Sequence, residues 1–190
     1  VKDLAVCSNE IKFKNINKTK RVKKLKKRLK RLQKQVSRKY EANKEGNKFV
    51  KTNNIIKLEK QIKLLYRKLS NIRNNHIHQA TNKIIKLKPY RIVMENLNVS
   101  GMMKNKHLSK AIAEQCFYEF IRQIKYKSKF NGIEFIQVDR FYPSSKKCSC
   151  CGNIKKDLKL KERTYICNEC GNKIDRDLNA SINLANYKLV

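Results

Sequence analysis

Two pairs of cysteines near the C-terminal end constrain the fold of this chain more than any other feature. Cys148 and Cys151 form one C-x2-C pair, Cys167 and Cys170 form a second, and fifteen residues separate the pairs. Each pair presents two thiolates from one turn, and a hairpin between the pairs brings all four around one tetrahedral ion. The spacing therefore predicts one Zn²⁺ ion bound by these cysteines. A pair of disulfides or free thiols is the alternative interpretation.

The remaining cysteines and two glycines refine this prediction. Gly152 and Gly171 each follow a pair and permit the backbone turn that wraps an ion. Cys150 lies inside the loop of the first pair, so a different ligand register stays open. Four thiolate ligands leave no coordination position for water, which favours a structural role for the zinc. Cys7 and Cys116 lie in apolar segments, and we expect them in the core.

The charge of the chain indicates a polyanionic partner. Its 190 residues include 47 Lys and Arg but only 15 Asp and Glu, a formal net charge of +32. Self-repulsion on this scale opposes compaction, so nucleic acid is the simplest partner. The densest run, residues 18–39, holds thirteen cations and no acid. We expect phosphate contacts from these cations, among them Lys20, Arg21, Lys24, Lys27, Arg28, Arg31 and Arg38. A charged helix that is merely solvated is the alternative.

An anionic membrane is the rival partner for a chain of this charge. No stretch approaches the ~20 apolar residues that cross a bilayer, and the sequence contains no signal peptide. We therefore expect no membrane partner and a cytoplasmic location.

Hydrophobic periodicity predicts alternating strands and helices. Apolar residues at steps of three and four predict helices over 18–42 and 55–87 that pack as an antiparallel hairpin around a turn at 43–54. The other elements expected from the apolar pattern are strands over 3–7, 11–13, 91–95 and 133–138, a loop over 96–106, and helices over 108–130 and 177–187. Tyr90, Phe141 and Tyr142 are candidates for stacking on bases, although such aromatics more often lie in the core.

Two carboxylates occur at the ends of predicted elements. Glu95 ends the strand at 91–95, and Asp177 starts the last helix. Carboxylate oxygens are ligands that Mg²⁺ prefers, and two such ions can bracket a scissile phosphate. Their position makes Glu95 and Asp177 candidate catalytic residues. The alternatives are a helix cap for Asp177 and an ion pair for Glu95.

Four stretches together resemble the C-terminal half of the TnpB proteins, also called OrfB, which bacterial insertion sequences encode. Residues 1–6 resemble the end of the first RuvC-like motif of that family, and residues 92–101 resemble the second. Residues 139–152 resemble the entry to its zinc ribbon, and residues 175–181 resemble its third motif. The resemblance covers essentially the whole chain.

This resemblance implies an α/β fold: an RNase H-like (RuvC-like) mixed sheet with an inserted basic helical hairpin and an inserted zinc ribbon. It divides the chain into a nuclease part at 1–144 with the hairpin at about 17–88, a zinc ribbon at 145–172, and a last nuclease part at 173–190. Intact members are RNA-guided, Mg²⁺-dependent DNA endonucleases, which implies DNA and a guide RNA as partners. Glu95 and Asp177 would be two of three metal-binding acids.

One departure from the family bears on activity. The first acid of the family lies in a G-I-D-x-G stretch directly before the segment that matches Val1, and Asp3 matches a non-catalytic position. We therefore expect this chain to lack the first acid and to be inactive alone. The alternative function is a non-catalytic, nucleic-acid-binding zinc-ribbon protein from a decayed mobile element.

Overall fold

The computed structural model describes residues 2–159 and 161–188. Val1, which begins one of the resembling stretches, and residues 189–190 of the expected last nuclease part lie outside the described residues. The chain divides into two compact units. The helical unit is Asn15–Gln79, and the mixed unit combines Val1–Lys14 with Ala80–Val190.

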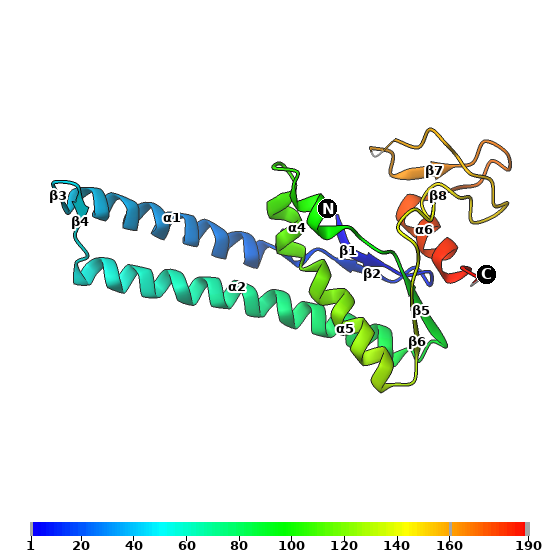
Figure 1. Ribbon diagram of the computed structural model, residues 1–190, viewed down its shortest axis with the longest axis horizontal. Coiled ribbons are helices and arrows are strands. Elements are labelled where there is room, and N and C mark those ends of the chain that lie inside the picture. The colour runs from blue at the N-terminus through cyan, green and yellow to red at the C-terminus, as the bar shows by residue number, and fades with distance from the viewer. Residues whose placement is uncertain (1, 160, 189–190) are drawn as a thin grey trace. The chain divides into compact units, whose positions relative to one another are not determined.

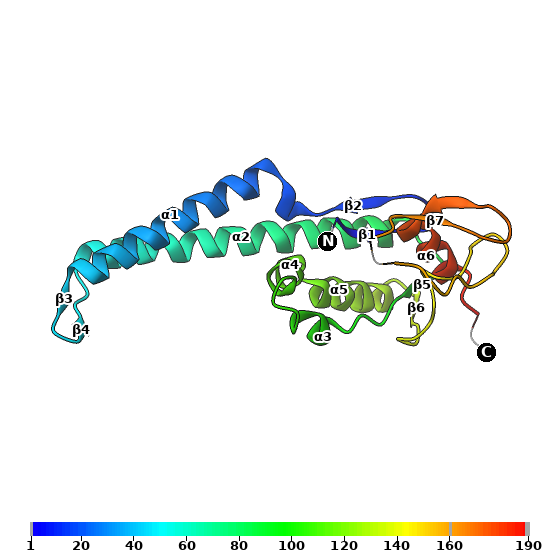
Figure 2. The ribbon, with the colours of Figure 1, turned by 90° about the horizontal axis from the view of Figure 1, so that it is seen from above.

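The helical unit is a pair of long antiparallel helices (Figures 1 and 2). After the short 3-10 helix η1 (Ile16–Lys18), Thr19 caps α1 (Lys20–Ala42) by accepting a 3.4 Å hydrogen bond from the Val22 amide. The second helix is the part of α2 (Asn53–Lys86) that ends at Gln79, where the helical unit ends. One cluster of buried side chains joins the two helices: Val22, Leu29 and Leu32 from α1 with Leu65 and Leu69 from α2. This confirms the hairpin that the apolar periodicity predicts.

The tip of the hairpin is more ordered than the predicted turn. Strands β3 (Lys44–Glu45) and β4 (Lys48–Phe49) form a minimal antiparallel ladder there. Beside it, Glu59 of α2 accepts a 2.8 Å hydrogen bond from the Tyr40 hydroxyl and lies 2.6 Å from the Lys51 ammonium. These contacts tie α1, the tip and α2 together at one end of the helical unit.

The described part of the mixed unit contains three pairs of strands. β1 (Asp3–Val6) pairs antiparallel with β2 (Lys12–Lys14), and β7 (Thr164–Ile166) pairs antiparallel with β8 (Lys173–Asp175). β5 (Arg91–Met94) pairs in parallel with β6 (Glu134–Gln137).

The mixed α/β architecture is confirmed, but the described strands form separate two-stranded ladders instead of one sheet. β1 and β5 do not share a ladder, and residues of both strands line a common cavity of about 290 Å³.

Four helices complete the described part of the mixed unit, with the end of α2. They are α3 (Val99–Met103), α4 (Ser109–Gln115), α5 (Phe117–Phe130) and α6 (Arg176–Ala185). The loop predicted at 96–106 is wrong in part, because Asn98 caps α3 by accepting a 3.0 Å hydrogen bond from the Gly101 amide.

The single helix predicted over 108–130 is also wrong. Cys116 adopts a left-handed conformation with φ of +53°, which breaks the helix into α4 and α5. The break lets Ile112 on α4 and Phe120 on α5 both lie buried although the helix direction changes between them.

The core position expected for Cys7 and Cys116 is not found, because both side chains are only half-buried. Cys7 directly follows β1 at the turn that leads to β2, and Cys116 occupies the helix break. Both therefore lie where the backbone leaves regular structure. An apolar sequence neighbourhood alone does not indicate such a position.

Candidate functional site

The four cysteines of the two pairs come from two turns of the same design. In each turn, the amide of the first cysteine donates to a carbonyl five residues later, at 2.8 Å for Cys148 and 2.9 Å for Cys167. The glycine after each pair donates back to the carbonyl of that first cysteine. Gly152 and Gly171 have φ of +81° and +70°, values that a side chain at these positions would strain. The turns that the glycines were expected to permit are therefore present.

The sulfur atoms of Cys148, Cys151, Cys167 and Cys170 all lie within 4.8 Å of one another. The separations between Cys148 and Cys170 and between Cys151 and Cys167 are 3.7 and 3.6 Å. Sulfur atoms at the corners of a tetrahedral zinc site lie roughly 3.8 Å apart, and a disulfide would need about 2.05 Å. The cluster can therefore hold a metal ion. Cys150 is exposed and lies outside the group.

The protonation of Cys148 suits a metal ligand. Burial raises the pKa of this thiol. Hydrogen bonds from the backbone amides of Cys151 and Cys150 and from the neighbouring thiols lower it by a larger amount, so the resulting pKa is about 6. A thiol with that pKa is largely thiolate at neutral pH, and the thiolate is the form that binds metals.

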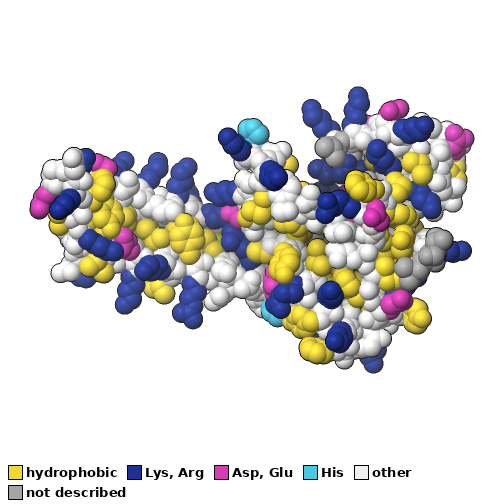
Figure 3. Space-filling model, viewed as in Figure 1, with side chains coloured by type: hydrophobic (Ala, Val, Ile, Leu, Met, Phe, Trp, Pro, Cys, Tyr) yellow, Lys and Arg dark blue, Asp and Glu magenta, His cyan; other side chains and the backbone are white. Residues whose placement is uncertain are grey.

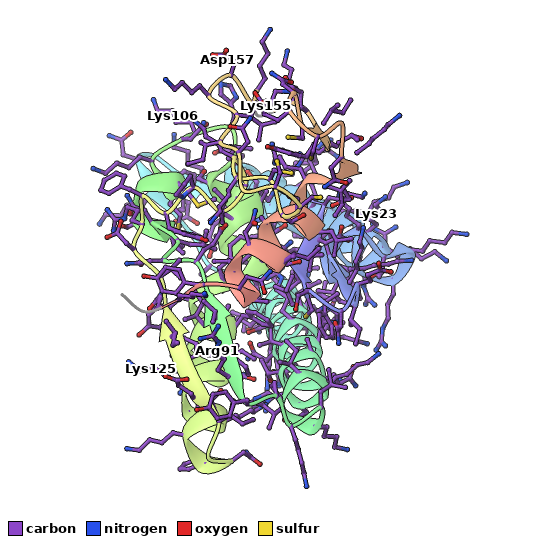
Figure 4. The ribbon with its side chains drawn as sticks, turned by 90° about the vertical axis from the view of Figure 1, so that its right-hand side faces the viewer. Lys23, Arg91, Lys106, Lys125, Lys155 and Asp157 are labelled. Atoms are coloured by element: carbon purple, nitrogen blue, oxygen red, sulfur yellow. The ribbon has the colours of Figure 1, made fainter. Side chains whose placement is uncertain are left out.

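Tyr165 forms the core of the cysteine module, and sequence reasoning missed it. Its side chain is fully buried against Cys148 and Cys167, and its hydroxyl donates to the Lys146 carbonyl at 3.1 Å. Burial, and then the charge of the nearby thiolates, raises the pKa of Tyr165 to about 12. The available signal was the alternation of Thr164, Tyr165 and Ile166, with one apolar aromatic facing inward. Lys155 and Asp157 lie on the loop of this module (Figure 4).

The two candidate acids line one cavity. Glu95 directly follows β5, Asp177 lies in the first turn of α6, and both border the cavity of about 290 Å³ between β1 and β5. Asp3 borders the same cavity. Within residues 2–159 and 161–188, however, the cysteine cluster is the one group of three or more possible ligands close enough to share an ion. The structure thus brings Glu95 and Asp177 to one cavity, but among the described residues they belong to no group of three ligands close enough to share an ion.

The helix-cap alternative for Asp177 is wrong, because Asp175 caps α6. The Asp175 carboxylate accepts hydrogen bonds from the Asp177 amide at 3.0 Å and the Leu178 amide at 3.1 Å, and it lies 3.3 Å from the Lys12 ammonium. The Asp177 carboxylate is half-exposed, with the Arg176 guanidinium 3.8 Å away. It is therefore available to a ligand in the cavity.

Glu95 has a hydroxyl partner from the loop before the cysteine module. The Ser144 hydroxyl donates a hydrogen bond to the Glu95 carboxylate, and Ser144 is only 4% exposed. The sequence alternative for Glu95 was a Lys or Arg partner. The partner is instead a neutral hydroxyl, which adds no positive charge beside the carboxylate.

The cations predicted on α1 are all exposed, and four of them border one groove of about 510 Å³. These are Lys24, Lys27, Arg28 and Arg31, and two more of the thirteen cations of residues 18–39, Lys30 and Lys34, line the groove beside them. Figure 3 shows Lys and Arg side chains projecting along the hairpin, with few acids on the same face.

A second groove, of about 790 Å³, lies along α2 in the helical unit. Arg21 borders it with Arg67, Lys68 and the amide side chains of Asn71 and Asn75. Sequence reasoning did not propose this surface. Its signal was the recurrence of cations and amides at three- and four-residue steps opposite the apolar stripe of α2.

The three aromatic candidates separate into two environments. Tyr90 and Phe141 are each 87% exposed, so the core position favoured for them is wrong. Tyr142 is half-buried, and its ring packs edge-on against Tyr187 with the centroids 5.0 Å apart. The exposed pair keeps its π-faces available to a partner.

Two family models match the chain. Residues 1–106 match the OrfB_IS605 model, described as "Probable transposase", and residues 117–184 match the Cas12f1-like TNB domain. None of the helices in the described ranges is long and apolar enough to span a membrane.

Similar proteins are longer than this chain. A "Putative RNA-guided DNA endonuclease" of Streptomyces pristinaespiralis is 30% identical over 128 residues, which cover 67% of this chain and 31% of the relative. The "Putative RNA-guided DNA endonuclease InsQ" of Escherichia coli K12 is 31% identical over 200 residues, which cover 97% of this chain and 46% of the relative. The chain thus spans less than half the length of these relatives.

A solved structure shares the fold. A chain of a CRISPR-Cas12f ternary complex superposes with a TM-score of 0.69 at 24% identity, covering 95% of this chain and 35% of the other.

Proposed function

Because the chain belongs to the OrfB (TnpB) family of probable transposases, we propose that it forms the nuclease half of an RNA-guided DNA endonuclease. The observation that carries this proposal is the meeting of Glu95 and Asp177 at one cavity from elements more than eighty residues apart in the chain. Relatives named as RNA-guided DNA endonucleases support the same reaction class.

In the proposed reaction, Glu95 and Asp177 supply carboxylate oxygens to Mg²⁺. Bound Mg²⁺ would activate water and stabilise the leaving oxygen of a DNA phosphodiester. Two contacts of the chain's own residues border this site: Asp175 caps the helix that carries Asp177, and the Ser144 hydroxyl donates to the Glu95 carboxylate. A third acid completes such a site in the intact protein, because a pair of carboxylates is too few to hold two ions in place.

The proposed domain division follows the resemblance. The nuclease part at 1–144 and 173–190 would be RuvC-like, with the hairpin at about 17–88 and a zinc ribbon at 145–172 as insertions. The compact helical unit at Asn15–Gln79 supports the first insertion, and the cysteine cluster supports the second. We propose Zn²⁺ as the ion of that cluster, because four cysteines are the ligand set typical of structural zinc.

The proposed partners are a guide RNA and target DNA. The exposed cations of α1 support this, since each would neutralise a phosphate and release counterions. A protein with these partners would act in the bacterial cytoplasm, at the nucleoid.

A second candidate is nucleic-acid binding without cleavage by the 190-residue chain alone. It is favoured by one observation: among the described residues, Glu95 and Asp177 belong to no group of three possible ligands close enough to share an ion. This candidate differs from the first only in chemistry, so a single experiment separates them.

The experiment compares Mg²⁺-dependent cleavage of target DNA by the intact guide-loaded protein and by the 190-residue chain. We expect cleavage by the intact protein, its loss in Glu95→Gln and Asp177→Asn with guide binding retained, and no cleavage by the chain alone. Wild-type cleavage by either variant would refute the roles of the two acids. Mg²⁺-dependent nicking by the chain alone would refute its inactivity.

A further inference from the structure

Two buried asparagines on α6 have no role in the function proposed above. Asn179 is fully buried and Asn183 is 4% exposed. They lie four residues apart, so they project from one face of the helix. Burying an amide side chain without partners costs about 1–3 kcal/mol, so buried amides normally occur where specific hydrogen bonds satisfy them.

The partners of both asparagines lie in the backbone that leads into the cysteine module. Asn183 donates to the carbonyls of Ser144 at 2.8 Å and Lys147 at 2.6 Å. Asn179 donates to the same Lys147 carbonyl at 2.7 Å and accepts from the Ser149 amide at 2.9 Å. The segment 144–149 is therefore held to α6 at three backbone positions.

This segment carries the donor to Glu95. The Ser144 residue whose carbonyl accepts from Asn183 also donates its hydroxyl to the Glu95 carboxylate. Asp177 lies on the same helix as Asn183 and borders the cavity that Glu95 borders. One helix thus carries one acid directly and holds the other through Asn183 and Ser144.

We propose that Ser144 and Asn183 are positioning residues that set the Glu95 carboxylate relative to Asp177. A buried hydroxyl that donates to a carboxylate restricts the rotamer of that carboxylate, and a cation site requires its ligands to be held in fixed positions. The inference rests on the proposed catalytic role of Glu95. It adds that the geometry of the acid pair is set from the backbone of segment 144–149, and it assigns Asn179 to fixing that backbone.

The test uses Ser144→Ala in the intact guide-loaded protein, with Ser145→Ala as the matched control one residue away. We expect Ser144→Ala to slow cleavage about tenfold or more, the change that losing one hydrogen bond to a charged group produces. We also expect a higher Mg²⁺ concentration at half-maximal rate. Guide binding, zinc content and the thermal midpoint should match those of Ser145→Ala. Asn183→Ala should act in the same direction.

A double mutant separates positioning from a general structural role. In a Glu95→Gln background, Ser144→Ala should cause no further loss of the residual rate, because its effect passes through Glu95. If Ser144→Ala fails to fold, Ser144→Cys replaces it, since it fills a similar volume with a weak donor. A wild-type rate and Mg²⁺ dependence in a folded Ser144 variant would overturn the inference. Wild-type cleavage by Glu95→Gln would instead overturn the proposed function.

Discussion

Asp175 and Asp177 lie two residues apart, and the structure predicts that loss of Asp175 lowers stability whereas loss of Asp177 does not. Asp175→Ala removes a cap that accepts two amide hydrogen bonds, at 3.0 and 3.1 Å, from the first turn of α6. Losing such a cap costs about 0.5–2 kcal/mol. The pair with Lys12 adds little, because both side chains are about one-third exposed, at 38% and 33%, and water screens the pair. We therefore expect a loss of about 1–2 kcal/mol in the free energy of unfolding of the mixed unit.

The pH dependence of this loss has a definite sign. Burial raises the pKa of Asp175, but the Leu178 amide and the Lys12 ammonium lower it by a larger amount. The pKa in the folded state therefore lies below that of an ordinary aspartate. A depressed carboxyl pKa contributes stability above the unfolded pKa of about 3.9, and this contribution disappears as the pH falls through the folded value. The difference between wild type and Asp175→Ala should therefore be constant near neutral pH and narrow below about pH 4.

The assay is urea denaturation of the chain at several pH values, followed by tyrosine fluorescence, since the sequence contains no Trp. Two controls accompany Asp175→Ala. Asp175→Asn keeps a capping acceptor and should lose only a few tenths of a kcal/mol. Asp177→Ala removes a carboxylate that borders the cavity and does not cap the helix, so the free energy of unfolding should stay within about 0.5 kcal/mol of wild type. If Asp177→Ala destabilised the chain as much as Asp175→Ala, the division of roles between the two acids would be refuted.

Two further predictions concern the metal and the basic face. Cys167→Ser should abolish the binding of the proposed zinc ion and remove much of the apparent ~10–16 kcal/mol of metal-linked folding energy. Cys150→Ser should bind zinc as the wild type does, measured by elemental analysis, and equal zinc content in the two variants would contradict the ligand set. Replacing Lys27 and Arg28 with Gln should reduce the slope of log affinity against log salt for duplex DNA by about 1.8, as measured by fluorescence anisotropy. Lys125→Gln on α5 is the control. An unchanged slope in the double variant would contradict the phosphate contacts.

Elements with a strong local pattern were predictable from the sequence. The hairpin of α1 and α2 follows from apolar residues at steps of three and four, and the cysteine turns follow from the C-x2-C-Gly repeats. The break at Cys116 was not predictable, because neither Gly nor Pro marks it. Cys116 nevertheless adopts a left-handed backbone conformation with φ of +53°, which is uncommon for a residue with a side chain.

The site shows the same limit more sharply. The sequence identified Glu95 and Asp177 by their place at element ends, yet it could not separate Asp177 from a helix cap, because Asp175 and Asp177 are equally suited to capping by composition. Only the backbone geometry of the first turn of α6 assigns the cap to Asp175 and leaves Asp177 facing the cavity.

The hydrogen-bond partner of Glu95 was even harder to predict from the sequence, since Ser144 lies 49 residues away in the chain. A serine in a polar loop carries no pattern of its own. What distinguishes Ser144 is burial at the end of a chain of hydrogen bonds that begins at Asn183. Both asparagines are buried on α6, yet in the sequence they look like ordinary polar residues of a short helix. A buried amide side chain destabilises the fold unless it forms hydrogen bonds, as Asn183 does with the Ser144 carbonyl. Following those hydrogen bonds from Asn183 through Ser144 leads to the Glu95 carboxylate.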